Sequence, residues 1–117
     1  MKLNEMAEKL GLRNLTPEID MEKAGDVTGG HAADLLSDVL VNAPRGGVLV
    51  TIQVHLNVIA VASHVGLAGV IFASNREPEE PLRQKAVEEG IALFVSQEPT
   101  FDVVGALYGL GLRGRRS

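Results

Sequence analysis

From residue 46 onward, one pattern occurs three times in this sequence: a short apolar segment is followed by a segment with helical composition. The apolar segments are 48–52, 69–73 and 92–96, and helices are expected at 56–65, 79–89 and 100–110. Apolar runs of this length that alternate with helices predict a parallel sheet joined by right-handed crossovers. We therefore expect a single α/β domain with a mostly parallel sheet and helices on both faces. Its C-terminal two-thirds should have the order βαβαβα.

The N-terminal third of the chain is less regular. A short amphipathic helix is expected to end at Gly11, because glycine is favoured directly after a helix. Leu15 and Thr16 are expected to form a short strand. Asp34 is expected to cap a further helix that ends before Pro44, because aspartate is a favoured first-turn acceptor and helices stop ahead of proline.

Composition excludes several classes of protein. The 117 residues include no cysteine, which excludes disulfides and thiolate metal sites. A net charge of −4 and an aromatic content of 3% argue against a nucleic-acid partner, which would require cationic contacts and stacking rings. No apolar run approaches the roughly 18 residues of a membrane span. We expect a cytoplasmic protein with no membrane partner, in which 1–112 form one domain and 113–117 a basic flexible tail.

Polar side chains follow each of the three predicted strands. The first two corners carry the candidate ligand-binding residues Thr51, Gln53, His55, Asn57, Ser74, Asn75 and Arg76. The carboxyl ends of parallel strands share one edge of a sheet, so these corners should converge, and Arg76 offers a planar fork that suits carboxylate or phosphate. This pattern predicts a site for a small anionic ligand. The alternative is that the same side chains only satisfy loop backbone and helix ends, with Asn57 and Thr100 as caps.

Catalytic and metal-binding patterns are not complete in this sequence. His55 is the acid–base side chain of the first corner, but no nucleophile partnered with a base lies near it. The spacing of His31, His55 and His64 matches no familiar metal-binding pattern. We expect neither catalysis nor a bound metal ion or cofactor.

The segment 56–65 is apolar on nearly all sides, with Asn57, Ser63 and His64 as its polar residues. A helix of this kind must be covered on more than one side. We expect it to form a self-association surface, most simply in a two-fold dimer. The alternative is that the N-terminal segment covers it.

Several blocks of the sequence resemble the DRTGG domain family. These blocks are 26–30 (DVTGG), 34–40 (DLLSDVL), 51–57 (TIQVHLN), 68–73 (AGVIFA) and 76–78 (REP). Their order and spacing are similar to the family over almost the whole chain. The motif loop that names the family consists here of Asp26, Thr28, Gly29 and Gly30, and Val27 stands where the family has arginine.

The resemblance implies a stand-alone DRTGG protein with a fold similar to the N-terminal domain of HPr kinase/phosphorylase. The family occurs fused to CBS-domain pairs and to phosphate acetyltransferase domains, which implies a regulatory, ligand-sensing or assembly role. Our leading hypothesis is a non-catalytic, dimeric regulatory domain that binds a small anionic metabolite or nucleotide. The alternatives are a structural module that docks a separate signalling or metabolic enzyme, and a small phosphotransfer enzyme that uses His55.

Overall fold

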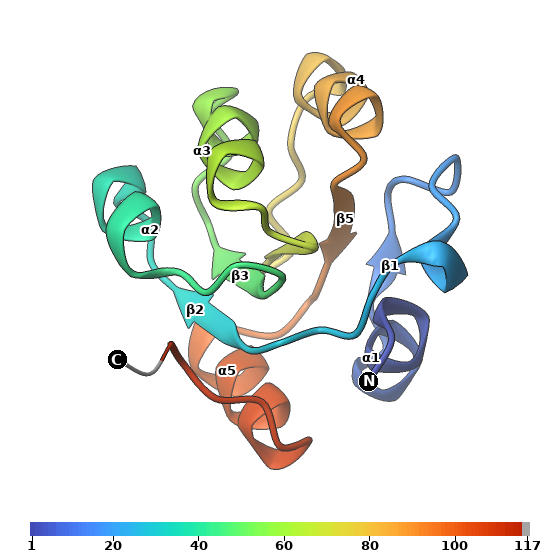
Figure 1. Cartoon of the computed structure of the whole chain (residues 1–117), viewed down its shortest axis with the longest axis vertical. Coiled ribbons are helices and arrows are strands. Elements are labelled where there is room, and N and C mark those ends of the chain that lie inside the picture. Colours follow the sequence, from blue (N-terminus) through green and yellow to red (C-terminus); the bar gives the residue numbers. More distant parts are fainter. Residues whose placement is uncertain (116–117) are drawn as a thin grey trace.

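The computed structural model describes residues 1–115, which contain a five-stranded sheet with helices on both of its faces (Figure 1). In spatial order, the strands are β1 (Arg13–Asn14), β5 (Ala92–Val95), β4 (Gly69–Phe72), β3 (Val48–Thr51) and β2 (Gly30–Ala32). Strands β2 to β5 are mutually parallel, and β1 runs antiparallel to β5. The expected α/β class with a mostly parallel sheet is confirmed.

The helices form two layers around this sheet. Figure 1 shows α2 (Leu36–Asn42), α3 (Asn57–Val65) and α4 (Glu80–Glu89) on one face, and α1 (Leu3–Leu10) and α5 (Thr100–Gly109) on the other. A short 3-10 helix, η1 (Met21–Lys23), lies between β1 and β2 in the chain. Within residues 1–115, none of the helices is both long enough and apolar enough to cross a bilayer.

Coverage on both faces explains the apolar runs of the sequence. Every residue of β3, β4 and β5 is buried, as in other parallel sheets enclosed by helices. Successive residues of a strand enter opposite cores: Leu49 packs with α2, α3 and α4, whereas Val48 and Val50 pack with α1 and α5.

Strand β2 was not predicted from the sequence. Its three residues, a glycine, a histidine and an alanine, follow turn-forming residues and include no β-branched side chain. The strand is defined by its neighbour instead, because Gly30 lies opposite Val48 and Ala32 lies opposite Val50 in a parallel register.

The first strand also differs from the prediction. It was expected at Leu15 and Thr16, whereas β1 comprises Arg13 and Asn14. The side-chain oxygen of Asn14 accepts a hydrogen bond of 2.8 Å from the backbone N–H of Thr16. This local bond turns the chain and ends the strand two residues early.

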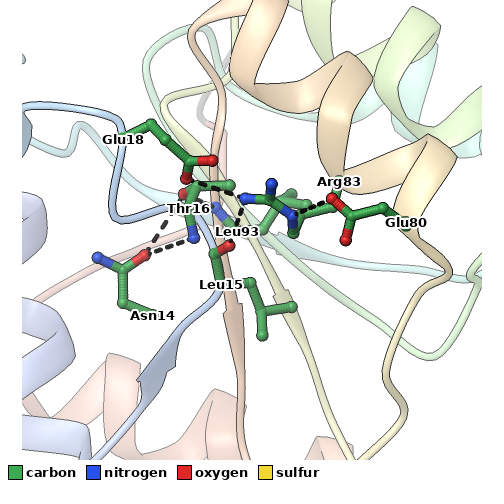
Figure 2. Close-up of polar contacts among 7 residues, drawn as sticks. All are labelled: Asn14, Leu15, Thr16, Glu18, Glu80, Arg83 and Leu93. Atoms are coloured by element: carbon green, nitrogen blue, oxygen red, sulfur yellow. Dashed lines mark hydrogen bonds and ion pairs between the residues drawn. The ribbon is translucent and has the colours of Figure 1, made fainter.

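A polar network fixes this turn against the sheet and α4 (Figure 2). Thr16 is fully buried, and its hydroxyl oxygen accepts a 3.0 Å hydrogen bond from the backbone N–H of Leu93 in β5. From α4, the Arg83 guanidinium donates to the carbonyl oxygen of Leu15 at 3.1 Å and pairs with Glu18 at 2.9 Å. The turn after β1 is therefore bonded to both β5 and α4.

The apolar helix α3 is covered within the chain. Ile59 and Ala62 belong to a core shared with α2 and α4, which flank α3 on either side (Figure 1). Its exposed residues include Ala60, Ser63 and His64, which are small or polar. The alternative that the N-terminal segment covers α3 is wrong, because α2 and α4 pack against it. Leu56, just before the helix, is 50% exposed, and a self-association surface here stays a prediction. Dimer formation itself stays a prediction.

The C-terminal segment lies along the outer edge of β2. The backbone N–H of Gly30 donates to the carbonyl oxygen of Arg113 at 3.0 Å, and the Arg115 guanidinium donates to the carbonyl oxygen of Val41. The flexibility expected for 113–117 stays a prediction, and 116–117 lie outside the described residues.

Candidate functional site

The corners that follow β3, β4 and β5 lie side by side at one edge of the sheet. The N–H of Ala73 donates to the carbonyl oxygen of Thr51 at 3.0 Å, which joins the first corner to the second. The N–H of Ser74 donates to the backbone carbonyl oxygen of Glu98 at 2.8 Å, and the N–H of Asn75 donates to that of Ser96 at 2.7 Å. These bonds join the second corner to the third. The three loops therefore form one continuous rim, as expected from the carboxyl ends of parallel strands.

Asp34 holds the first corner in a way that the sequence did not predict. One of its carboxylate oxygens accepts hydrogen bonds of 2.9 Å from both the hydroxyl of Thr51 and the N–H of Ile52. The predicted cap is wrong: α2 begins at Leu36, with Leu35 at the cap position and no side-chain cap bond. Asp34 instead fastens the loop after β2 to the end of β3.

The polar side chains of the first corner form a ladder of local hydrogen bonds. Each accepts a bond of 3.0 Å from the backbone N–H two residues further on: Thr51 Oγ1 from Gln53, Gln53 Oε1 from His55, and His55 Nδ1 from Asn57. Because Nδ1 of His55 is an acceptor here, a neutral ring carries its proton on Nε2. Asn57 is not a cap, since it is the first residue of α3, and Thr100 likewise begins α5 after Pro99.

The second corner has an unusual backbone. Ser74 and Asn75 have φ angles of +57° and +55°, in the left-handed region that residues other than glycine rarely adopt. The bonds to the third corner hold this conformation, and both side chains are exposed. Strain of about 1 kcal/mol or more per residue tends to be retained where a loop must present particular groups.

Arg76 and its neighbour Glu77 are both exposed, but their surroundings differ. Both oxygens of Glu77 accept hydrogen bonds from the Arg13 guanidinium, at 3.0 and 3.4 Å. Within residues 1–115, the Arg76 side chain has no hydrogen bond or ion pair. Asn75 lines a polar cavity of about 190 Å³ together with residues of α1, β5 and the third corner. The rim therefore combines a free guanidinium with an amide at a cavity wall.

The motif loop lies at the opposite edge of the sheet, where β2 and β3 begin. The Thr28 hydroxyl donates to the carbonyl oxygen of Arg45 at 2.7 Å, and a Cβ added to Gly29 would lie 2.5 Å from the carbonyl oxygen of Arg113. Val27 is buried, and Asp26 is exposed. The contacts of Thr28 and the two glycines join β2 to neighbouring backbone, so this loop and the three corners are separate.

The three histidines also lie on different segments of the fold. Nε2 of His31 lies 2.8 Å from a carboxylate oxygen of Asp38, and this bond, with a second from Asn42, lowers the pKa of the Asp38 carboxyl. His55 and His64 are exposed on other segments. Within residues 1–115, no three His, Asp or Glu side chains are grouped so that they could hold a metal ion.

A second cavity lies beneath β2 and was not predicted. It has a volume of about 220 Å³, with mainly apolar walls from Val50, Val104, Leu107 and Leu112. Its position depends on the unpredicted strand β2 and on the return of the C-terminal segment, so the order of residues along the chain gives no signal for it.

Comparison with known proteins relates the chain to others through its fold. No family model and no curated protein sequence matches it. The fold is similar to the crystal structure of the CBS and DRTGG domains of the regulatory region of Clostridium perfringens pyrophosphatase, complexed with its activator, diadenosine tetraphosphate. The TM-score is 0.67 at 15% identity, over 90% of this chain and 46% of that chain.

This chain therefore spans less than half the length of the neighbour. At 15% identity the likeness shows a shared fold, and it agrees with the DRTGG resemblance of the sequence.

Proposed function

We propose that this chain is a non-catalytic, cytoplasmic regulatory domain of the DRTGG type that senses a small anionic ligand, such as a nucleotide. The sequence resemblance supports the family, and the structural neighbour is a regulatory region in complex with a nucleotide activator. The candidate site comprises the corners after β3 and β4, with Thr51, Gln53, His55, Asn57, Ser74, Asn75 and Arg76.

The observation that carries this proposal is the contrast between Arg76 and Glu77. The nearest carboxylate in the sequence is engaged by Arg13, so it does not neutralise Arg76. A guanidinium without an acidic partner favours an anion, and it can bind carboxylate or phosphate through two parallel hydrogen bonds. The loop that carries Arg76 is held by backbone bonds to the third corner, so binding needs little ordering of the loop.

The roles of the seven residues differ. Thr51 is buried and bonded to Asp34, so it supports the loop and does not meet the ligand. Gln53 and His55 use one side-chain acceptor each on the loop backbone. Nε2 of His55 and the exposed side chains of Asn75 and Arg76 are left as donors for an anion. Nucleophilic catalysis would need a nucleophile beside a base, which this set does not provide.

A thermal-shift screen tests the proposal. The panel contains nucleotides, diadenosine tetraphosphate, acyl phosphates and phosphorylated sugars. A ligand at one hundred times its Kd adds about 2.7 kcal/mol of stability, which for a domain of this size raises Tm by on the order of 10 °C. The Arg76→Ala variant should lose the shift, whereas Arg45→Ala, which removes an exposed arginine at the opposite edge, should keep it. Unchanged Tm across the panel would refute ligand sensing.

A second function, a docking module for a separate signalling or metabolic enzyme, is favoured by a different observation. Large apolar side chains are exposed on α5 and near α2, namely Leu35, Val41, Phe101 and Tyr108. Such residues are typical of protein contact surfaces. If docking is the function, His55→Ala and Arg76→Ala leave partner binding intact, and Phe101→Glu abolishes it.

A further inference from the structure

Helix α5 has two contrasting sides. Val103 and Leu107 are buried against the sheet. On the opposite side, Phe101 is 85% exposed and Tyr108 is 57% exposed. We define the α5 stripe as Phe101, Val104, Gly105 and Tyr108, which are spaced i, i+3, i+4 and i+7 and therefore share one helical face. Whereas α3 has a helix on each side, α5 shares its face of the sheet with α1 alone (Figure 1).

The cavity beneath β2 opens beside this stripe. Val104 and Tyr108 line it, and the β2 wall consists of Gly30, His31 and Ala32. Phe101 lies one to two helical turns away, or about 5–10 Å along the axis from Val104 and Tyr108. One helix thus carries both a protruding aromatic ring and an apolar recess.

The two ends of the stripe differ in charge. Asp102, the charged residue of α5, follows Phe101 at the start of the helix. At the other end, the Arg113 guanidinium lies 3.6 Å above the centre of the Tyr108 ring. Two such stripes in antiparallel orientation bring the acidic end of each to the basic end of the other. The middle of the stripe is uncharged, which suits two copies that each carry a net charge of −4.

We propose that the α5 stripe binds the same stripe of a second copy of this chain about a two-fold axis near Val104 and Gly105. In this arrangement each Phe101 lies against Tyr108 and the recess of the other copy. The contact is self-complementary, since the same two residues meet twice. Gly105 at the crossing lets the helix backbones approach closely. The proposal goes beyond ligand sensing, and its tests do not depend on the corner residues.

A cysteine cross-link tests the geometry directly, because the chain has no cysteine of its own. Gly105→Cys and Gly109→Cys are matched variants: both glycines lie exposed on α5, and an added Cβ has no neighbour within 4 Å at either. A disulfide needs Cα atoms within about 7 Å. Mild oxidation should therefore join copies through residue 105, on the axis, and not through residue 109, about 6 Å further along the helix on each copy.

Measurement of the molar mass against concentration, by sedimentation, provides the second test. The unmodified chain should associate to a dimer, and Phe101→Ala should weaken the dimer Kd by about 30-fold or more, as for a central aromatic contact. Val41→Ala removes an apolar side chain that is 64% exposed on α2 and should leave Kd unchanged. Three results would each overturn the proposal. They are a chain that stays monomeric, a dimer Kd that Phe101→Ala does not change, and equal yields of cross-linked dimer at residues 105 and 109.

Discussion

The carboxylate of Asp34 accepts a 2.9 Å hydrogen bond from the hydroxyl of Thr51, which is fully buried at the end of β3. The same oxygen also accepts from the N–H of Ile52. One acidic side chain thus links the loop after β2 with the first corner of the candidate site.

Replacing Asp34 with alanine should destabilise the protein by about 1–3 kcal/mol, because a buried hydroxyl and a backbone N–H lose their acceptor. Asp34→Asn keeps one oxygen acceptor and should cost less. Urea unfolding measures both losses, and hydrogen exchange locates them: protection should fall at Ile52. Loss of protection confined to the first turn of α2 would instead support the helix-cap interpretation.

The pair formed by His31 and Asp38 predicts an acid-sensitive contribution to stability. The hydrogen bond from His31, and then that from Asn42, holds the pKa of the Asp38 carboxyl below its ordinary value. A lowered folded-state pKa gives stability that is fully present above the unfolded pKa and is lost as pH falls through the folded value. The free energy of unfolding should therefore decline below about pH 4. Asp38→Asn should reduce this slope, whereas Glu8→Gln on the exposed side of α1 should not change it.

Close backbone approach at Gly29 predicts intolerance of any side chain. An alanine Cβ would lie 2.5 Å from the carbonyl oxygen of Arg113, so the C-terminal segment would have to move. We expect Gly29→Ala to cost about 1–3 kcal/mol, in the range of other overpacked sites. Gly25→Ala, where the added Cβ meets nothing within 4 Å, is the matched control. Equal urea midpoints for the two variants would contradict this role of Gly29.

Removing the buried hydroxyl of Thr16 should destabilise the pairing of β1 with β5. Thr16→Val keeps the shape of the side chain but leaves the N–H of Leu93 without its 3.0 Å acceptor. The expected cost is about 1–3 kcal/mol, together with faster hydrogen exchange at Leu93. Thr100→Val makes the same chemical change at a half-buried position without a side-chain hydrogen bond, and it should be nearly neutral.

The local pattern of the sequence predicted the three central strands because each one is an apolar run enclosed by helices. It did not predict β2, whose residues have no strand signature and depend on pairing with β3. The role of Asp34 was missed for a similar reason: its partners, Thr51 and Ile52, are 17 and 18 residues further along the chain.

Residues of the candidate site were recognised as polar corners, but their conformations were not. The left-handed backbone at Ser74 and Asn75 is held by hydrogen bonds to the loop after β5. Asparagine adopts this region more readily than most residues, but serine has no such preference, so the local sequence does not indicate the pair. Likewise, composition showed that α3 needed cover on several sides, but only the packing of α2 and α4 shows where that cover comes from. The most exposed large apolar side chain, Phe101, lies on α5 instead.

The carbonyl oxygen of Arg113 accepts a hydrogen bond from the outward-facing N–H of Gly30. The chain therefore covers part of the outer edge of β2 itself. Unpaired sheet edges recruit strands from other molecules and promote aggregation. Shortening the chain to end at Leu112, or fusing a bulky tag there, would uncover this edge. Arg113 therefore protects part of this edge from pairing with other molecules, and a design that removes it should aggregate more readily.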